Sequence, residues 1–537
     1  MIRTIAELPF TAADAYGDRP AHRAKRGGGW VDMSFKELGD TVRALARGLI
    51  GAGIAPGDRV ALLAETTPEW TQAGLAVVAA GAILVPIYPS SSVEECRWIL
   101  GDSGARMAIC ADPAQLAKVE RDLLPDLAST VVMSEGELAA LAADEGDAEL
   151  DRRLAAIEPD DPSIIIYTSG TTGPPKGCVL TQRNWVALCT INEQLPYIVA
   201  GDVVYLFLPL AHVFAQITQF ACLHAGATLA YFGGDPRAIV PELAEVRPTF
   251  LPSVPRIFEK VYTALQGAPP AAARAVFGGR LRMALSGAAP IALGVLEFFA
   301  AAGVPVLEGY AMTESTGVGT VNTLADHRLG SVGLAAPGTG ITIAEDGEVL
   351  MSGPHIFAGY WRNPEATAAT LVDGWLHTGD LGVLDDDGYL TITGRKKDII
   401  ITSGGKNIAP ANLENDLRQS RWISYAVVYG DRRPYPIALL TLDPEEIVPW
   451  AAARGLPTDL AVLAGHPEVR ALLDGVVDEV NARYARVMQI KRFAVLDRDL
   501  SQDTGELTPT LKVKRAVVQA RHTTTIDALY GESDGRG

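Results

Sequence analysis

The sequence has few cysteines and no excess of basic residues. Its five cysteines among 537 residues are odd in number, have no Cys-x-x-Cys spacing and all precede residue 223. This pattern predicts reduced thiols and argues against a disulfide framework or a zinc cluster. Lysine and arginine number 46 against 64 aspartates and glutamates, which gives a formal net charge of -18. The balance disfavours non-specific binding to nucleic acid or anionic lipid, so any basic site must be local.

Long uninterrupted apolar runs are also missing. Residues 1–7 lack the apolar core of a signal peptide, so we expect no export and a cytoplasmic location. The two long uncharged stretches, 70–93 and 203–234, are broken by glycine and proline, and the second also by histidine. Each is interpreted as a buried helix followed by a buried strand rather than a membrane span. Peripheral contact with lipid is left open by the composition, although no basic or amphipathic anchor stands out.

Alternating segments predict an α/β fold. An apolar helix over 35–52 and a strand over 59–64 are followed by a helix over 69–80 and a strand over 83–87. The body of the chain is therefore expected to be a stack of mostly parallel sheets covered by helices. The acidic, alanine-rich segment 135–162 is predicted to be a surface helix and linker.

The length predicts more than one domain. The pattern changes character near residues 394–398, after which 399–407 reads as a strand and a tight loop. The remainder has the size of a small α+β domain. We therefore expect domains at 1–395 and 396–530 and a disordered tail at 531–537.

A run of hydroxyls, glycines and one lysine after a buried strand at 163–167 predicts a phosphate loop. It is not a Walker A loop, because Pro175 stands where that motif has glycine and Gly177 replaces its Ser or Thr. For the loop alone, a Gly/Pro turn between strands is the alternative. The residues expected to contact phosphate are Thr168, Ser169, Gly170, Thr171, Thr172, Gly173 and Lys176.

Further motifs occur in register with this loop. They are Tyr310-Ala311-Met312-Thr313-Glu314, Thr378-Gly379-Asp380, Gly394-Arg395-Lys396-Lys397-Asp398 and Pro509-Thr510-Leu511-Lys512. Their order and spacing resemble the adenylate-forming superfamily of acyl-CoA synthetases, peptide adenylation domains and luciferases, over practically the whole chain. The C-terminal loops most resemble those of bacterial long-chain fatty acyl-CoA synthetases. This resemblance implies a small barrel-like part in the large domain and a mobile C-terminal domain.

The resemblance implies that a carboxylate attacks the α-phosphorus of ATP and expels pyrophosphate. Such chemistry depends mainly on charge neutralisation and positioning. The resemblance assigns Mg²⁺ to Glu314, the α-phosphate to Thr313, and catalysis of adenylation to Lys512, whose flexible point charge can arrive and then leave. Outside the motif, Glu314 would read as a solvated or capping carboxylate and Lys512 as part of a basic patch.

The same resemblance assigns the nucleoside. Gly287, Ala288 and Ala289 are similar to the adenine-binding segment, where small residues leave a slot, and Tyr310 is expected to stack on the base. Outside this context a buried tyrosine would more often belong to the core. Asp380 resembles the ribose ligand, with Arg395 as its partner on the same nucleotide.

The resemblance implies a second half-reaction, after adenylate formation, in which coenzyme A is the acyl acceptor. By resemblance, Lys397 matches the hinge about which the small domain rotates, and Ser403 and Gly404 approach the pantetheine arm. Lys514 and Arg515 are interpreted as solvated surface charges. The acyl chain is expected to enter near His212 and Ala311, although His212 reads equally well as a core histidine.

The predicted function is ATP-dependent activation of a long-chain fatty acid to acyl-AMP and its transfer to coenzyme A. Most relatives have glycine where this chain has Ala311, so a ligase for another carboxylic acid remains open. A second alternative is a fatty acyl-AMP ligase that loads an acyl carrier protein, although the insertion that such ligases carry is missing between residues 330 and 359. A non-catalytic nucleotide-binding protein is disfavoured by the intact charged residues, and a luciferase-like oxidation has no separate signal. The oligomeric state is not readable.

Overall fold

A computed structural model describes residues 2–168, 174–265, 267–508 and 511–531. Its largest sheet has nine strands, and every pairing from β13 to β1 along the sheet is parallel. In spatial order the strands are β15 (Leu334–Ala335), β14 (Thr320–Val321), β13 (Val306–Tyr310), β12 (Met283–Ser286), β11 (Phe250–Ser253), β9 (Val203–Leu206), β10 (Thr228–Tyr231), β1 (Pro20–Arg26) and β2 (Gly29–Ser34).

A second sheet has seven strands and a parallel centre that runs from β7 to β6. Its order is β18 (Gly359–Tyr360), β8 (Lys176–Thr181), β7 (Pro162–Thr168), β4 (Ile83–Ile87), β3 (Arg59–Leu63), β5 (Met107–Cys110) and β6 (Ser129–Val132). The α/β fold of stacked, mostly parallel sheets that the sequence predicts is therefore confirmed.

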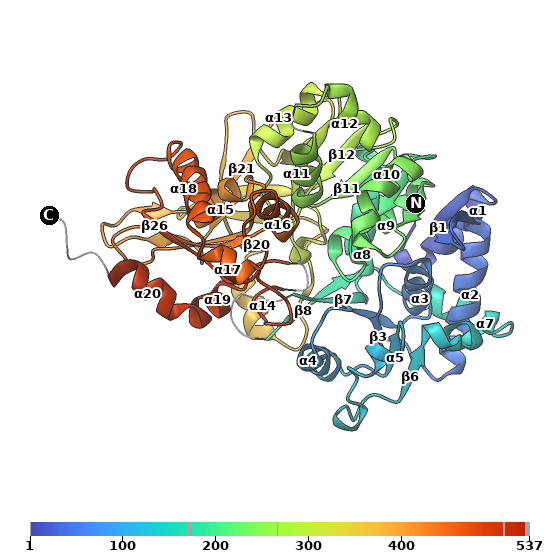
Figure 1. Ribbon diagram of the computed structural model, residues 1–537. Coiled ribbons are helices and arrows are strands. Elements are labelled where there is room, and N and C mark those ends of the chain that lie inside the picture. Colours follow the sequence, from blue (N-terminus) through green and yellow to red (C-terminus); the bar gives the residue numbers. More distant parts are fainter. Residues whose placement is uncertain (1, 169–173, 266, 509–510, 532–537) are drawn as a thin grey trace.

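Helices cover these sheets and connect their strands (Figure 1). They are α1 (Leu8–Tyr16), α2 (Phe35–Gly51), α3 (Pro68–Ala79), α4 (Val93–Ser103), α5 (Pro113–Leu116), α6 (Glu137–Leu141), α7 (Asp147–Ala156), α8 (Gln182–Gln194), α9 (Val213–Ala225), α10 (Ile239–Val246), α11 (Pro255–Ala264), α12 (Pro270–Val276), α13 (Leu293–Ala301) and α14 (Pro364–Thr370). Short 3-10 turns lie between several of them, including η5 (Thr313–Ser315).

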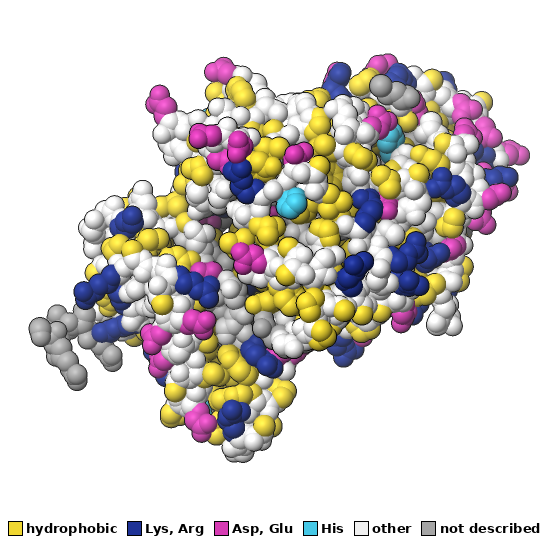
Figure 2. Space-filling view, turned by 90° about the horizontal axis from the view of Figure 1, so that it is seen from above, with side chains coloured by type: hydrophobic (Ala, Val, Ile, Leu, Met, Phe, Trp, Pro, Cys, Tyr) yellow, Lys and Arg dark blue, Asp and Glu magenta, His cyan; other side chains and the backbone are white. Residues whose placement is uncertain are grey.

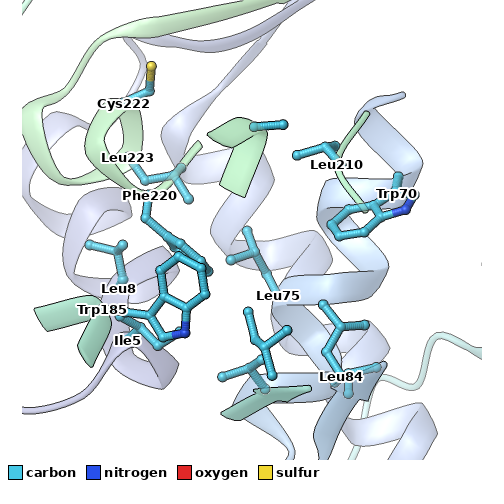
Figure 3. Close-up of a cluster of buried hydrophobic side chains, with 14 of the residues drawn as sticks. Ile5, Leu8, Trp70, Leu75, Leu84, Trp185, Leu210, Phe220, Cys222 and Leu223 are labelled. Atoms are coloured by element: carbon cyan, nitrogen blue, oxygen red, sulfur yellow. The ribbon is translucent and has the colours of Figure 1, made fainter. Parts of the chain in front are cut away.

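The main core joins the two large sheets. Helix α3 begins at Pro68 behind the N-cap Thr67, whose side chain accepts from the Trp70 amide, and its remaining residues except Glu69 are buried. Trp185 of α8 packs against Phe220 of α9 with ring centroids 4.9 Å apart (Figure 3). Burial of each such large side chain contributes about 1.5–3 kcal/mol, so this layer holds the two sheets together.

A third sheet is entirely antiparallel and supplies part of the site. It comprises β16 (Gly340–Ile343), β17 (Glu348–Ser352), β20 (Trp375–Leu384) and β19 (Leu371–Val372), with β21 (Leu390–Arg395) paired to β20. This small sheet is a separate component beside the two large sheets.

The C-terminal elements form a smaller unit with its own core, at the left of Figure 1. Its strands are β22 (Ile400–Ile401), β23 (Asn407–Ile408), β24 (Ile423–Tyr429), β25 (Ile437–Leu442) and β26 (Arg492–Val495), and the last three form one sheet. Its helices are α15 (Pro410–Arg418), α16 (Pro444–Ala452), α17 (Leu460–Ala464), α18 (Pro467–Asn481), α19 (Arg515–Arg521) and α20 (Thr523–Gly531). Apolar clusters lie on both faces of the sheet, one with α15, α16 and α18 and the other with α19 and α20.

Two local predictions differ from the structure. Segment 135–162 contains two short helices, α6 and α7, and not one, because the chain between them passes through a bend and the left-handed Gly146 before α7 begins. The stretch 203–234 begins with a strand, β9, before its buried helix and strand. Most of the predicted tail lies outside the described residues, and Gly531 ends α20.

The cysteines and the helices can be compared with the expectations from the sequence. All five cysteines are buried and free. Within the described ranges, no helix combines the length and the apolar character needed to cross a membrane. Figure 2 shows charged side chains of both signs interspersed with hydrophobic ones over the visible face.

Candidate active site

The segment after β13 places Thr313 and Glu314 in a tight turn. Both lie in η5, and each is 8% exposed. The turn ends at Thr316 in a left-handed conformation, with φ of 53°. The Glu314 carboxylate accepts a hydrogen bond of 2.8 Å from the Tyr360 hydroxyl. The carboxylate is therefore held in place but is not sealed from solvent.

The predicted phosphate loop lies between two antiparallel strands of the seven-stranded sheet. Thr168 at the end of β7 pairs with Lys176 at the start of β8. The segment between them therefore joins two paired strands, and Lys176 is the first residue of the second strand. Lys176 Nζ lies 4.4 Å from the centroid of the Tyr360 ring. Ser169, Gly170, Thr171, Thr172 and Gly173 lie outside the described residues.

The predicted adenine segment follows β12. Phe214 of α9 lies so close to Gly287 that an added Cβ would stand 3.2 Å from its ring, so a larger residue there would press on it. Ala288 has φ of 68°, an uncommon left-handed conformation for a residue with a side chain, and Ala288 and Ala289 are exposed. The backbone thus turns sharply at the position that the sequence assigns to the base.

Tyr310, Asp380 and Arg395 form one hydrogen-bonded group. The Tyr310 hydroxyl donates to Asp380 Oδ2 at 2.6 Å, and Arg395 Nε donates to Asp380 Oδ1 at 2.7 Å. Asp380 and Arg395 belong to the antiparallel sheet, where Asp380 of β20 lies opposite Arg395 of β21. Burial raises the pKa of Tyr310, and the charge of Asp380 adds to the shift, so the phenol remains a donor.

Lys512 enters this group from the C-terminal unit. The Lys512 side chain is exposed. Desolvation by nearby protein atoms and the positive charge of Arg395 lower the pKa of its ammonium. Asp380 and Glu314 act in the opposite direction. Lys512 therefore lies within electrostatic range of both carboxylates that the sequence assigns to nucleotide and metal. Its backbone is fixed by Thr508, whose hydroxyl accepts from the Lys512 amide at 3.0 Å.

His212 caps α9 beside the same space. Its Nδ1 accepts from the Phe214 amide at 3.1 Å, which leaves the ring proton on Nε2. Burial lowers the pKa of His212 to about 3, and the charge of Lys512 contributes, so the ring is neutral at physiological pH. Ala311, between Tyr310 and Met312, is half-buried. A neutral histidine can donate from Nε2 without adding charge to the site.

The remaining predicted residues stay within or near the C-terminal unit. Lys397 is exposed, and its neighbour Lys396 pairs with Asp346 and, at 3.2 Å, with Glu348. The Ser403 amide donates to the Arg433 carbonyl at 2.9 Å. In the described ranges, no hydrogen bond or ion pair joins Ser403 or Gly404 to residues before 396. Lys512 thus lies near Asp380, Arg395 and Glu314, three of the residues with predicted roles, whereas the 403–404 loop has no such contact in the described ranges.

One interpretation of the sequence is wrong. Lys514 and Arg515 are not solvated charges: Lys514 Nζ lies 3.2 Å from Glu95 of α4, and Arg515 pairs with Glu414 and donates to the Val428 carbonyl. Their partners lie far away in the sequence, so local composition did not reveal them.

Sequence reasoning also missed Tyr360 and Cys178. Cys178 lies opposite Tyr360 in the pairing of β18 with β8, and its thiol is close to Glu314. Burial raises the pKa of this thiol, and the charge of Glu314 raises it further, so Cys178 stays protonated. Neither residue belongs to a motif with its own chemical signature, and only the strand pairing reveals them.

Two family models match this chain. Residues 10–361 match the AMP-binding enzyme family, and residues 397–534 match the AMP-binding enzyme C-terminal domain. The chain belongs to the AMP-binding enzyme family. It is 39% identical over 561 aligned positions to the long-chain-fatty-acid–CoA ligase FadD15 of Mycobacterium bovis, covering 94% of this chain and 93% of that protein.

Solved structures of AMP-binding enzymes have the same architecture. The o-succinylbenzoate CoA synthetase MenE of Bacillus subtilis, in complex with its acyl-adenylate intermediate, matches with a TM-score of 0.77 and 24% identity, over 96% of this chain and 98% of that one. A fatty acyl CoA synthetase of Mycobacterium tuberculosis matches with a TM-score of 0.69 and 25% identity, over 97% and 99% of the two chains. The fold predicted for an adenylate-forming enzyme is confirmed.

Proposed function

We propose that this chain is an AMP-forming long-chain fatty acid:coenzyme A ligase. The observation that carries the proposal is the placement of Lys512 within electrostatic range of Asp380, Arg395 and Glu314. A curated relative that matches 94% of the chain is a long-chain-fatty-acid–CoA ligase. The substrates are ATP, a fatty acid and coenzyme A.

In the first half-reaction the fatty carboxylate attacks the α-phosphorus of ATP and pyrophosphate leaves. Negative charge accumulates where two anions meet, so a cation aimed at that point stabilises the transition state. Lys512 supplies this charge from the C-terminal unit, and Lys176 supplies charge at the phosphate loop. Asp380 accepts from the ribose hydroxyls, and neutral His212 can donate from Nε2 to the substrate carboxylate.

The donor set fits Mg²⁺ bound through one carboxylate and substrate phosphates. Glu314 is an oxygen ligand that remains slightly exposed, and in the described ranges no cluster of three or more His, Cys, Asp or Glu side chains forms a metal cage. When bound, Mg²⁺ would be held by Glu314 and would neutralise charge on the phosphate oxygens. Thr313 donates its hydroxyl hydrogen bond to the α-phosphate.

In the second half-reaction the coenzyme A thiol attacks the acyl carbonyl and AMP leaves. We assign residues 1–395 to the adenylation domain and 396–530 to a mobile domain that rotates about Lys397. Rotation withdraws Lys512 and presents Ser403 and Gly404 to the pantetheine arm. The coenzyme A thiol is a good nucleophile even when only a few per cent of it is ionised. Thioester formation therefore needs no cysteine of this chain, and all five are buried.

A panel of carboxylic acids, assayed for pyrophosphate release with and without coenzyme A, tests the proposal. We expect release with long-chain fatty acids and acyl-CoA formation when coenzyme A is present. Adenylate that accumulates without thioester would favour a ligase that loads an acyl carrier protein. Release with short or aromatic acids alone would assign another carboxylic acid, and no release with any acid would exclude a ligase.

A further inference from the structure

Tyr360 joins two residues of the nucleotide site that come from different motifs. Its hydroxyl donates to Glu314 Oε1 at 2.8 Å, and Lys176 Nζ lies 4.4 Å from the centroid of its ring. We propose that Tyr360 is a positioning residue that aligns the metal-binding carboxylate and seats the phosphate-loop lysine until the triphosphate arrives. The inference rests on the proposed function and assigns a residue that the motifs do not contain.

The backbone fixes the Tyr360 ring in this place. Strand β18 pairs with β8, so Tyr360 stands opposite Cys178, two residues beyond Lys176. The Tyr360 amide donates to Thr367 Oγ1 at 2.9 Å. Gly359 has φ of 136°, and a Cβ there would stand 2.6 Å from Thr367, so only glycine allows this approach.

The hydroxyl is a permanent donor to Glu314. The Tyr360 hydroxyl is the donor in the 2.8 Å bond to Glu314 Oε1, because an ionised carboxylate can only accept. A hydrogen bond to a charged acceptor is stronger than one between neutral groups and fixes the direction of the carboxylate. Tyr360 thus holds one oxygen of Glu314 and orients the other.

The two charged residues contact different parts of the Tyr360 side chain, Lys176 the ring and Glu314 the hydroxyl. Lys176 and Glu314 are both described by the structure, and they are not within ion-pair distance of each other. A cation over an aromatic face is attracted weakly enough to be drawn away by a phosphate. Without the ring, Lys176 could pair directly with Glu314, and that pair would compete with Mg²⁺ for the carboxylate.

Calorimetric titration with ATP, once with Mg²⁺ and once with EDTA, tests the inference without turnover, because no acid is present. Tyr360→Phe keeps the ring and removes the hydroxyl. We expect the affinity gained from Mg²⁺ to fall about tenfold, the effect of one hydrogen bond to a charged group, with metal-free ATP affinity within about twofold of the unaltered chain. Tyr360→Leu removes both contacts and should weaken metal-free binding as well.

A matched control is Tyr389→Phe. Tyr389 also has a cation over its ring, with the Arg328 guanidinium carbon 4.4 Å from the centroid, but it lies beside the turn between β20 and β21 and outside the site. This variant should change neither affinity. Thermal denaturation of Tyr360→Phe, in which the ring is preserved, checks that the fold is intact.

The outcomes separate the inference from the proposed function. An unchanged Mg²⁺ effect in Tyr360→Phe would overturn the positioning role. In steady-state assays the variant should raise the KM for Mg·ATP and leave the KM for coenzyme A unchanged; equal changes in both would indicate a merely structural tyrosine. If the unaltered chain binds no ATP with or without Mg²⁺, the proposed function itself fails.

Discussion

Arg256 of α11 donates to the carboxylate of Asp443, the N-cap of α16, across 2.9 Å. One turn further along α11, Lys260 Nζ lies 2.9 Å from Glu445. Both bonds connect the C-terminal unit to the nine-stranded-sheet part of the molecule. They therefore contribute to the arrangement in which Lys512 lies near Asp380, Arg395 and Glu314.

The double variant Arg256→Ala with Lys260→Ala should slow adenylation several-fold and leave thioester formation from supplied acyl-adenylate unchanged or faster. Exposed ion pairs contribute about 0–1 kcal/mol each, so the shift in domain arrangement is modest. Single-turnover measurement of each half-reaction checks this expectation. High salt should slow adenylation in the unaltered chain more than in the double variant, because salt screens exposed pairs.

Arg183→Ala is the control for the ion pairs. Its pair with Asp160, at 2.7 Å and also exposed, lies wholly within residues before 396. It should change neither half-reaction. Equal slowing of both half-reactions by the double variant would contradict a role in domain arrangement.

Removal of the Lys512 ammonium should affect the two half-reactions unequally. In Lys512→Ala we expect adenylation to fall by about 10²–10³, the usual loss when one group that stabilises transition-state charge is removed. Thioester formation from supplied acyl-adenylate and coenzyme A should stay within a few-fold. Lys491→Ala, at an exposed lysine of the same unit whose Nζ contacts Gln489 at 3.0 Å, serves as the control and should retain adenylation. Equal losses in both steps would refute the two-arrangement assignment.

Gly317 tests the space beside α9. Its φ is 71°, and a Cβ there would stand 2.9 Å from Ile217 Cγ2 and 3.3 Å from Val213 Cγ2. Gly317→Ala should lower the free energy of unfolding by more than about 1–2 kcal/mol, which is the cost of the left-handed conformation alone. It should also shift the preferred acyl chain length. Thermal denaturation and a fatty-acid panel measure the two effects.

Gly57→Ala isolates the backbone contribution. Gly57 has φ of 79°, and nothing lies within 4 Å of the position that a Cβ would take. In this variant the free energy of unfolding should fall only by the conformational cost of alanine at this φ, and the preferred acyl chain length should not change. If both alanine variants behave alike, Ile217 and Val213 do not constrain this position.

The sequence predicted what depends on local order. The predicted helix 35–52 is close to α2 because the Ser34–Glu37 capping box marks its start and an amphipathic pattern runs along it. Glu314, Asp380 and Arg395 were assigned roles because each lies in a motif with defined chemistry, and these roles stay predictions. The structure adds that Asp380 and Arg395 pair with each other.

What the sequence missed depends on pairing between distant segments. Tyr360 contacts Glu314 across 46 positions and reaches Lys176 only because β18 adds to the edge of β8. Lys514 finds Glu95 across 419 positions. No local pattern records such partners, so a charged residue without a nearby partner was interpreted as solvated.

A buried carboxylate supports the segment that carries Lys512, and its titration should be visible in stability. Glu506 is fully buried and accepts from Arg498 at 2.7 Å and from Thr504 at 2.6 Å, and its backbone carbonyl accepts from the Lys514 amide. Burial alone would raise the pKa of Glu506, but these hydrogen bonds and the charge of Arg498 outweigh it and lower the pKa to about 2.

Because the pKa of Glu506 is lower in the folded state, its ionised form stabilises the fold. This contribution is fully present above the ordinary value of 4.5 and is lost as the pH falls from there toward 2. Urea denaturation from pH 7 to pH 3 should therefore show a steeper loss for the unaltered chain than for Glu506→Gln, which is less stable at pH 7. Glu479→Gln, at a side chain that is 78% exposed, is the control and should follow the unaltered chain. If Glu506→Gln and the unaltered chain lost stability identically with pH, the ionised Glu506 would not stabilise the fold through Arg498. The segment that carries Lys512 would then be held by other contacts.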